Sequence, residues 1–289
     1  MLQQRLQLHA RPAFALCEPR CVGERVVCQD ASGSGVTRPV GPAPTIAIDG
    51  CGTSSILSSL DVTGLVSVIV PVLDEALELP RALDALAALP GTWEVIVVDG
   101  GSRDDSVALA RAHPRADQVL SQTAGGRALQ LNAGAAAAGG DPLVFLHADS
   151  RLPPEAHAAL SGARAPGGNF ALRFGGLQPD RFARLLTRFY ALQRRHGYYY
   201  GDSTLWCRRE LFERLSGFRE LPIMDDYDFV RRMQKEGHTA CLPGPSTTSD
   251  RRWRKQGIAR TALSWWVIRW LFVAGVAPDR LARFYRRVR

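Results

Sequence analysis

Three short segments of the chain end in acidic side chains that could hold a cation or a ribose. Each is an apolar, β-branched run: Val66 to Glu75 (VSVIVPVLDE), Val95 to Asp105 (VIVVDGGSRDD) and Leu143 to Pro153 (LVFLHADSRLP). Such runs are typical of buried parallel strands, and an open α/β sheet binds its ligand at the carboxyl ends of its strands. We therefore expect Asp74 and Glu75, Asp99, and Asp149 to converge. Because clustered carboxylates repel one another, the expected ligand is a divalent cation, a ribose or both.

The elements that must position these acids alternate between strand and helix. We expect strands at 65–70, 94–99, near 119 and at 143–147, and helices at 79–89, 103–113, about 127–138 and about 180–195. This alternation indicates βαβ units and a mostly parallel central sheet with flanking helices. Ser102 is the expected N-cap of the second helix, with Asp104 and Asp105 in its first turn.

The composition is typical of a globular protein, and the C-terminal residues 251–289 are basic. The 289 residues are 46% hydrophobic and carry a formal charge of +8, enough for one large or two modest domains. Residues 251–289 hold 11 basic and 1 acidic residue, whereas residues 61–250 hold 20 and 23. The excess charge is therefore confined to the tail. No nucleic-acid partner is expected, because no aromatic and basic residues interleave on a recognised module.

The two ends of the chain differ in character. Residues 1–60 lack helical or strand periodicity, which predicts a flexible extension or a mis-assigned start. Their four cysteines, with Cys207 and Cys241, predict no zinc site and no disulfide framework. No stretch there has the length of a signal peptide's apolar region, so a cytoplasmic chain is expected.

The segment from Ala262 to Val276 (ALSWWVIRWLFVAGV) leaves two interpretations open. It is only 15 residues long and is interrupted by Arg269, which is too short to span a bilayer comfortably. It is either an amphipathic helix lying in an anionic membrane interface, at the inner face of the cell membrane, or a core-packing helix with a basic solvent face.

Several motifs follow the order found in glycosyltransferase family 2, which the chain resembles from about Leu65 to Trp253. VSVIVPVLDE resembles the family's opening strand, VIVVDGGSRDDS its "VDDGSxD" strand, GGRALQLNAGA its "KGxxxAxNxG" helix start, and LHADS its "DxD" strand end. The resemblance implies a GT-A fold at 61–250, with a nucleotide-binding half at 65–150, an acceptor half at 151–250 and a basic, Trp-rich helical segment at 251–289. The segments HADSRLP, GRALQLNAGA, Gly201 to Ser203 (GDS) and Met224 to Asp226 (MDD) also resemble motifs of a bacterial subgroup of arsenosugar-associated or diaponeurosporenoate-type (carotenoid-acid) glycosyltransferases.

The resemblance also implies site residues for a UDP- or GDP-sugar and a divalent metal. The nucleotide-sugar residues are Pro71, Asp74, Glu75, Asp99, Gly101, Gly126, Arg127, Asn132, Arg252 and Trp253. A glycine turn at a helix N-terminus favours a diphosphate. Asp149 is the main ligand expected for Mn²⁺ or Mg²⁺, and His147 is either a second ligand or a packed residue, since these ions prefer oxygen.

The family's "ED" motif corresponds to Asp225 and Asp226, which implies that Asp226 is the base of an inverting transfer. We expect Asp225 and Asp228 to raise the pKa of Asp226 by repulsion; the alternative is that these acids only cap a helix. Tyr200 and Asp202 are implied near the acceptor, a small molecule or lipid with a hydroxyl or a carboxylate. No transmembrane helices are visible, so a single sugar transfer is expected rather than polymerisation.

Two other functions are alternatives to sugar transfer. A nicotinamide-dependent dehydrogenase is excluded, because Pro71 to Glu75 follows the first strand where a GxGxxG turn is required. A catalytically inactive scaffold at the membrane surface stays open, because Gly100, His147 and Ser203 depart from the family's motifs.

Overall fold

The computed structural model describes residues 20–22, 25–27, 64–122, 126–175 and 180–285. The chain divides into two units, Met1–Ser58 and Ser59–Arg289, which we describe separately. In the first unit, β1 (Arg20–Val22) pairs antiparallel with β2 (Arg25–Val27). The flexible extension expected at 1–60 otherwise lies outside the described residues.

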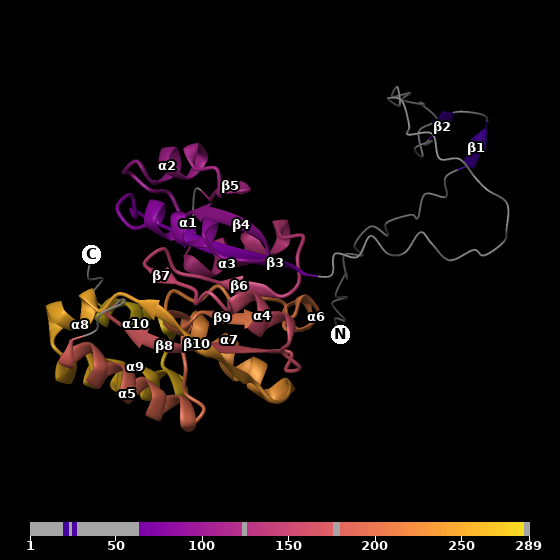
Figure 1. The fold of residues 1–289 in the computed structure, drawn as a ribbon. Helices are drawn as coiled ribbons and strands as arrows, with labels where there is room; N and C mark the ends of the chain where they lie inside the picture. The colour runs from indigo at the N-terminus through magenta and orange to yellow at the C-terminus, as the bar shows by residue number, and fades with distance from the viewer. Residues whose placement is uncertain (1–19, 23–24, 28–63, 123–125, 176–179, 286–289) are drawn as a thin grey trace, which may run out of the picture. The chain divides into compact units, whose positions relative to one another are not determined.

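The second unit is built around a sheet of eight strands in its described part (Figure 1). These strands are β3 (Leu65–Val72), β4 (Thr92–Asp99), β5 (Gln118–Ser121), β6 (Leu143–Phe145), β7 (Ser150–Arg151), β8 (Gly167–Phe174), β9 (Leu205–Cys207) and β10 (Ala240–Thr248). Their order is β5-β4-β3-β6-β9-β8-β10-β7. The first four are parallel, and β9 runs antiparallel to both β6 and β8. The expected mixed α/β fold with a mostly parallel sheet is confirmed, and β9 joins its two parts.

Helices cover both faces of this sheet. They are α1 (Leu79–Ala87), α2 (Ser106–Ala112), α3 (Arg127–Ala137), α4 (Ala156–Ser161), α5 (Arg181–Arg195), α6 (Arg209–Arg214), α7 (Asp225–Glu236), α8 (Arg251–Gln256), α9 (Ile258–Val273) and α10 (Pro278–Phe284), with a 3₁₀ turn η1 at Gly201–Ser203. Asp180 caps α5 by accepting from the N–H of Ala183. Gly134 allows α3 to lie directly on β3, because a Cβ there would collide with Ile69.

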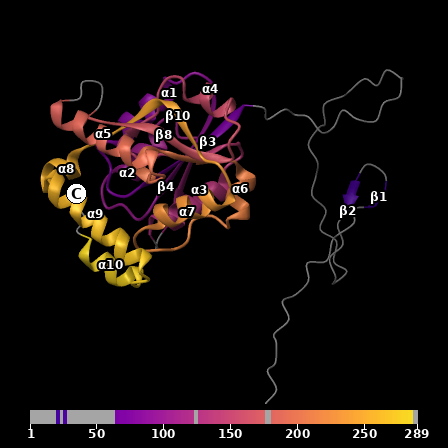
Figure 2. The same cartoon turned by 90° about the horizontal axis from the view of Figure 1, so that it is seen from below.

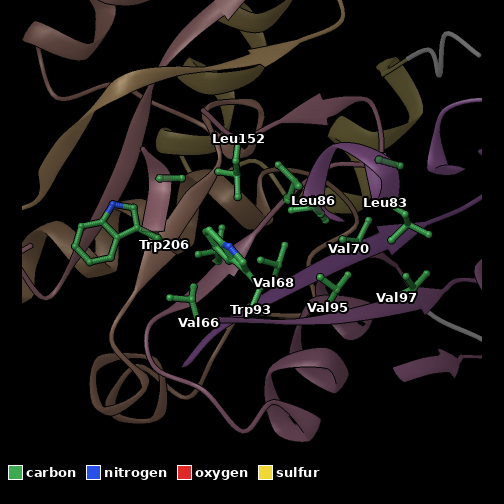
Figure 3. Packing of buried hydrophobic residues seen from close by; sticks show 14 of the residues in the cluster. Val66, Val68, Val70, Leu83, Leu86, Trp93, Val95, Val97, Leu152 and Trp206 are labelled. Atoms are coloured by element: carbon green, nitrogen blue, oxygen red, sulfur yellow. The ribbon is translucent and has the colours of Figure 1, made fainter. Parts of the chain in front are cut away.

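Two apolar clusters lie on opposite faces of the parallel strands. Along β3, Val68 and Val70 face the first cluster and Ile69 faces the second. Figure 3 shows the first cluster, in which Leu83 and Leu86 of α1 pack against the β3 and β4 valines. Burial on both faces explains why these strands are continuous apolar runs rather than alternating ones.

The helices α8, α9 and α10 follow one another along one side of this unit (Figure 2). No helix in the described ranges combines the length and apolarity needed to cross a membrane. One side of α9 packs inward through Thr261, Trp265 and Ile268. Its other side is also largely apolar rather than basic, with exposed Leu263, Trp266, Val267, Trp270, Leu271 and Val273. The inward packing agrees with the core-packing interpretation, but the basic solvent face expected with it is largely apolar instead. The membrane-interface interpretation stays a prediction.

Candidate active site

One cavity of about 1030 Å³ lies at the carboxyl ends of β3 and β6. Twelve of the predicted site residues line it: Pro71, Asp74, Glu75, Gly126, Arg127, His147, Asp149, Tyr200, Asp202, Asp225, Asp226 and Trp253. Asp99, Gly101 and Asn132 do not line it. The side chain of Arg252 lies outside the described ones.

Asp99 shapes the loop behind this cavity. Its carboxylate is buried and accepts hydrogen bonds from the N–H of Gly101 at 3.0 Å and of Ser102 at 3.1 Å. Gly101 has φ +93°, a left-handed conformation that glycine adopts without strain. In this structure both predicted residues therefore contribute to the shape of the β4 loop rather than to the cavity wall.

The loops after β3 and β4 are bonded to each other through these side chains. The N–H of Asp74 donates to Ser102 Oγ at 2.9 Å, and that of Glu75 donates to Ser106 Oγ at 2.8 Å. Ser102 is therefore not the N-cap that we expected: α2 begins at Ser106, and the N-cap position is Asp105. The physical reason is that the Ser102 hydroxyl is used between loops, where it orients the backbone that presents Glu75.

Asn132 has a similar structural task. Its amide nitrogen donates to the carbonyl of Phe218 and its amide oxygen accepts from the N–H of Phe218, both at 2.8 Å. These two bonds fasten α3 to the segment that precedes α7. The asparagine of the helix motif thus acts at a distance from the cavity it was predicted to line.

Glu75 and Asp149 face the same cation. Arg251 Nη2 lies 3.7 Å from a Glu75 carboxylate oxygen and 3.6 Å from one of Asp149. Burial and then repulsion by Asp149 raise the pKa of Glu75 above its ordinary value. Arg251 was not among the predicted site residues, whereas its neighbour Arg252 was. Both lie in the segment Ser249 to Trp253 (SDRRW), and nothing in that segment distinguishes the two.

Asp225 and Asp226 begin α7 and face a second cation, Arg127. Arg127 binds Asp225 through two hydrogen bonds, at 3.0 Å from Nε and 2.6 Å from Nη2, and its Nη2 lies 3.4 Å from Asp226. Together the two carboxylates raise the pKa of Arg127, although burial alone would lower it. Arg127 was predicted as a diphosphate ligand, and in this structure it lines the cavity while pairing with the α7 acids.

The pKa of Asp226 is lowered, which contradicts the expected rise. Burial by itself would raise it, but Arg127 and the N–H groups of Gly201 and Tyr227 stabilise the charged form more strongly. Asp228, which we expected to repel Asp226, is paired with Arg219 and Arg232 instead. The prediction was wrong because Arg127 reaches Asp226 from a distant part of the chain, while Asp228 is paired with arginines on and near α7.

His147 packs towards Asp226. A Cβ added at Gly201 would lie 3.1 Å from both His147 Nε2 and an Asp226 oxygen, so the imidazole and the carboxylate border the same glycine. Burial, followed by the charge of Arg127, lowers the pKa of His147 and keeps the ring neutral. Within the described residues, no group of three or more His, Cys, Asp or Glu side chains is arranged to hold a metal ion alone.

Residues 67–213, half of the chain, match the family model "Glycosyl transferase family 2". The chain belongs to this family. It is 38% identical over 100 residues to the undecaprenyl-phosphate 4-deoxy-4-formamido-L-arabinose transferase of Pseudomonas syringae pv. syringae (strain B728a), covering 31% of this chain and 29% of the relative. It is 34% identical over 99 residues to the transferase of the same name in Salmonella choleraesuis (strain SC-B67), covering 31% of this chain and 30% of the relative. The chain thus spans under a third of the length of these relatives.

Two solved structures share the fold. Staphylococcus aureus TarS in complex with UDP-GlcNAc has a TM-score of 0.51 at 16% identity, covering 64% of this chain and 58% of TarS. The mannosyltransferase PcManGT from Pyrobaculum calidifontis, in complex with GDP-Man and Mn²⁺, has a TM-score of 0.52 at 22% identity, covering 75% and 68%. The expected GT-A fold is confirmed.

Two departures from the family 2 motifs have local structural reasons. At Gly100, a Cβ would lie 2.8 Å from the Gln130 amide nitrogen, which donates to the carbonyls of Val72 and Val98 at 2.8 Å each. Gln130 thus ties the ends of β3 and β4 together and leaves no room for a side chain at 100. Ser203 is buried and donates to the carbonyl of Tyr200 at 2.6 Å, which closes the η1 turn.

Aromatic side chains form part of the lining of this family 2 cavity. Tyr200 stacks on Tyr227 at 6.1 Å between ring centroids and contacts Trp265 of α9 at 5.9 Å. Burial raises the pKa of Tyr200 to about 12, so its hydroxyl keeps its proton at neutral pH. Trp253 is buried and packs edge-on against Tyr190 of α5 at 5.9 Å.

Proposed function

We propose that this family 2 protein is a metal-dependent inverting glycosyltransferase that moves one sugar from a UDP- or GDP-sugar to a small-molecule or lipid acceptor. The observation that carries the proposal is the single cavity that Glu75 and Asp149 share with Asp226. Breaking the bond between sugar and diphosphate needs charge neutralisation at one end, and activating an acceptor needs a base at the other. The complexes of TarS with UDP-GlcNAc and of PcManGT with GDP-Man support the donor class.

The donor set at Glu75 and Asp149 fits a divalent cation. Two carboxylates face one exposed arginine at more than 3.5 Å, and the pKa of Glu75 is raised partly because the two repel each other. Mg²⁺ and related ions are usually bound by one or two carboxylates, with substrate phosphates completing the shell. We assign Asp149 as main ligand with Glu75 beside it. When bound, such an ion supplies Lewis-acid stabilisation to the departing diphosphate, as the Mn²⁺ of PcManGT suggests.

Asp226 is the proposed base for an acceptor hydroxyl. The acceptor oxygen forms the bond to the anomeric carbon, the bond to the diphosphate oxygen breaks with its electron pair, and Asp226 takes the hydroxyl proton. The N–H of Gly201, at 2.9 Å, holds one carboxylate oxygen in place. We assign to Arg127 and Asp225 the positioning of Asp226, and to Tyr200 and Asp202, which line the same cavity, contact with the acceptor.

Release of nucleoside diphosphate tests the donor and metal roles. The wild-type protein should release UDP or GDP from at least one nucleotide sugar in a panel, and only with Mn²⁺ or Mg²⁺ present. Asp149→Asn should lower this rate by about 100-fold or more, because the ligand loses its charge. Asp84→Asn, an exposed change on α1, should leave the rate unchanged. If no donor in the panel is cleaved, the protein is the inactive scaffold instead.

We also propose a peripheral position at an anionic membrane surface. The support is the exposed apolar side of α9 and the 11 basic residues against 1 acidic residue in 251–289, a combination typical of interfacial helices. Trp270→Ser removes an exposed indole from α9 and should lower co-sedimentation with phosphatidylglycerol vesicles several-fold. Unchanged co-sedimentation would argue against this position.

A further inference from the structure

Four exposed apolar side chains line the cavity where it reaches the surface. They are Phe189 and Leu192 of α5 and Leu263 and Trp266 of α9, and we call them the apolar rim. Exposed apolar side chains gathered around an opening are unfavourable in water unless something covers them. Other exposed apolar residues on the same helices, such as Leu185 and Val273, do not line the cavity.

The apolar rim is connected to the proposed base by a short series of contacts. Asp226 accepts from the N–H of Gly201, and the preceding Tyr200 contacts Trp265, which is next to Trp266 in α9. The same cavity is therefore lined both by the carboxylates and by the apolar rim. A ligand that fills it has a polar end at Asp226 and an apolar end between α5 and α9.

Basic side chains also line the cavity. Arg269 of α9 lies 4.5 Å from the centroid of the Tyr198 ring, and both residues line the cavity with Lys255. Cations beside an apolar opening favour an amphiphile at a lipid surface over a wholly apolar ligand.

We propose that the apolar rim binds the hydrocarbon chain of a membrane-lipid acceptor whose polar head lies at Asp226. This inference rests on the proposed function, because it names the acceptor class of the same cavity. It assigns recognition of the acceptor's hydrocarbon chain to α5 and α9.

Chain-length dependence of binding tests the proposal. Dodecyl phosphate and butyl phosphate, both below micelle-forming concentrations, are titrated calorimetrically into the full chain. Wild-type protein should bind dodecyl phosphate at least about 100-fold more tightly, because burial of several additional methylenes is favourable. Leu192→Ser with Leu263→Ser should weaken dodecyl phosphate binding about tenfold and leave butyl phosphate binding unchanged.

The matched control is Leu185→Ser with Val273→Ser. Leu185 is 59% and Val273 is 61% exposed, against 53% for Leu192 and 62% for Leu263, and each control lies on the same helix as its counterpart. This control should bind both probes as the wild type does. An equal loss in both double variants, or no preference for the longer chain, would overturn the proposal.

Two further outcomes are informative. If the rim variant instead dissociates a dimer, measured by sedimentation velocity, a second copy covers the apolar rim and the proposal fails. If chain-length dependence is found but no metal-dependent release of UDP or GDP occurs, the glycosyltransferase function fails and the acceptor role fails with it. Metal-dependent release of UDP or GDP without chain-length dependence of alkyl phosphate binding refutes only the role of the apolar rim.

Discussion

The two carboxylate pairs of the cavity differ in how tightly a cation holds them. Glu75 and Asp149 share the exposed Arg251 at 3.6–3.7 Å. Asp225 and Asp226 are buried and face Arg127 at 2.6–3.4 Å, with two direct hydrogen bonds to Asp225. Glu75 and Asp149, which we call the loose pair, make only long contacts with their cation, whereas Asp225 and Asp226, the tight pair, are contacted directly by Arg127.

This difference separates binding from positioning. An exposed ion pair contributes little free energy, so another cation displaces Arg251 at small cost. The pair of Arg127 with Asp225 is costlier to break, because the buried carboxylate would lose its cation. The loose pair, Glu75 with Asp149, therefore suits reversible binding of a metal ion. The tight pair, Asp225 with Asp226, suits a base that must keep a fixed orientation.

The largest expected effect is on the tight pair. Asp226→Asn should lower transfer to a hydroxyl acceptor at least about 100-fold, since the amide cannot take the proton. With a carboxylic acid acceptor, already ionised at neutral pH, activity should stay largely intact. Rates for both acceptor classes separate the two cases. Asp228→Asn is the control: it removes one charge from α7 at a residue that does not line the cavity, and should change neither rate.

A second prediction concerns pH. The lowered pKa of Asp226 keeps its carboxylate ionised, so the acid limb of kcat/KM should lie below the ordinary aspartic acid value of 3.8. Arg127→Gln removes the main group that lowers this pKa while burial, which raises it, remains. The acid limb should therefore move to higher pH, by about one unit or more.

A matched control separates this effect from a general loss of positive charge. Arg219→Gln removes a cation whose guanidinium lies 3.0 Å from the carboxylate of Asp228, a residue of α7 like Asp226. This variant should leave the acid limb in place. Circular dichroism at each pH confirms that the variants remain folded. If Arg127→Gln and Arg219→Gln shift the limb equally, the buried pair does not set the pKa of Asp226.

The smallest expected effect is on the loose pair. Arg251→Gln should tighten Mn²⁺ binding to the donor-free protein about threefold, because a competing exposed cation is removed from Glu75 and Asp149. Calorimetric titration with Mn²⁺ measures it. Weaker Mn²⁺ binding in this variant would mean that Arg251 organises the two carboxylates rather than competing for them, and the contrast between the pairs would disappear.

Much of the fold was predictable because local pattern and burial agree. The β3 and β4 runs are apolar on both faces since α1 packs on one side and α3 on the other, and such runs are recognisable in the sequence. The start of α2 was not predictable from Ser102, because a hydroxyl that resembles an N-cap is used instead by the backbone of a neighbouring loop.

The sequence by itself determined the family, the strands that end in acids and twelve of the residues that line the cavity. Only the tertiary structure decided how the predicted side chains are used: Asp99 and Asn132 bind backbone groups, while Glu75, Asp149 and Asp226 line the cavity. The physical reason is that a carboxylate's role depends on the donors and cations that face it. Here those groups are Arg127, Arg251 and the N–H of Gly201, which lie 25 to 176 residues away along the chain.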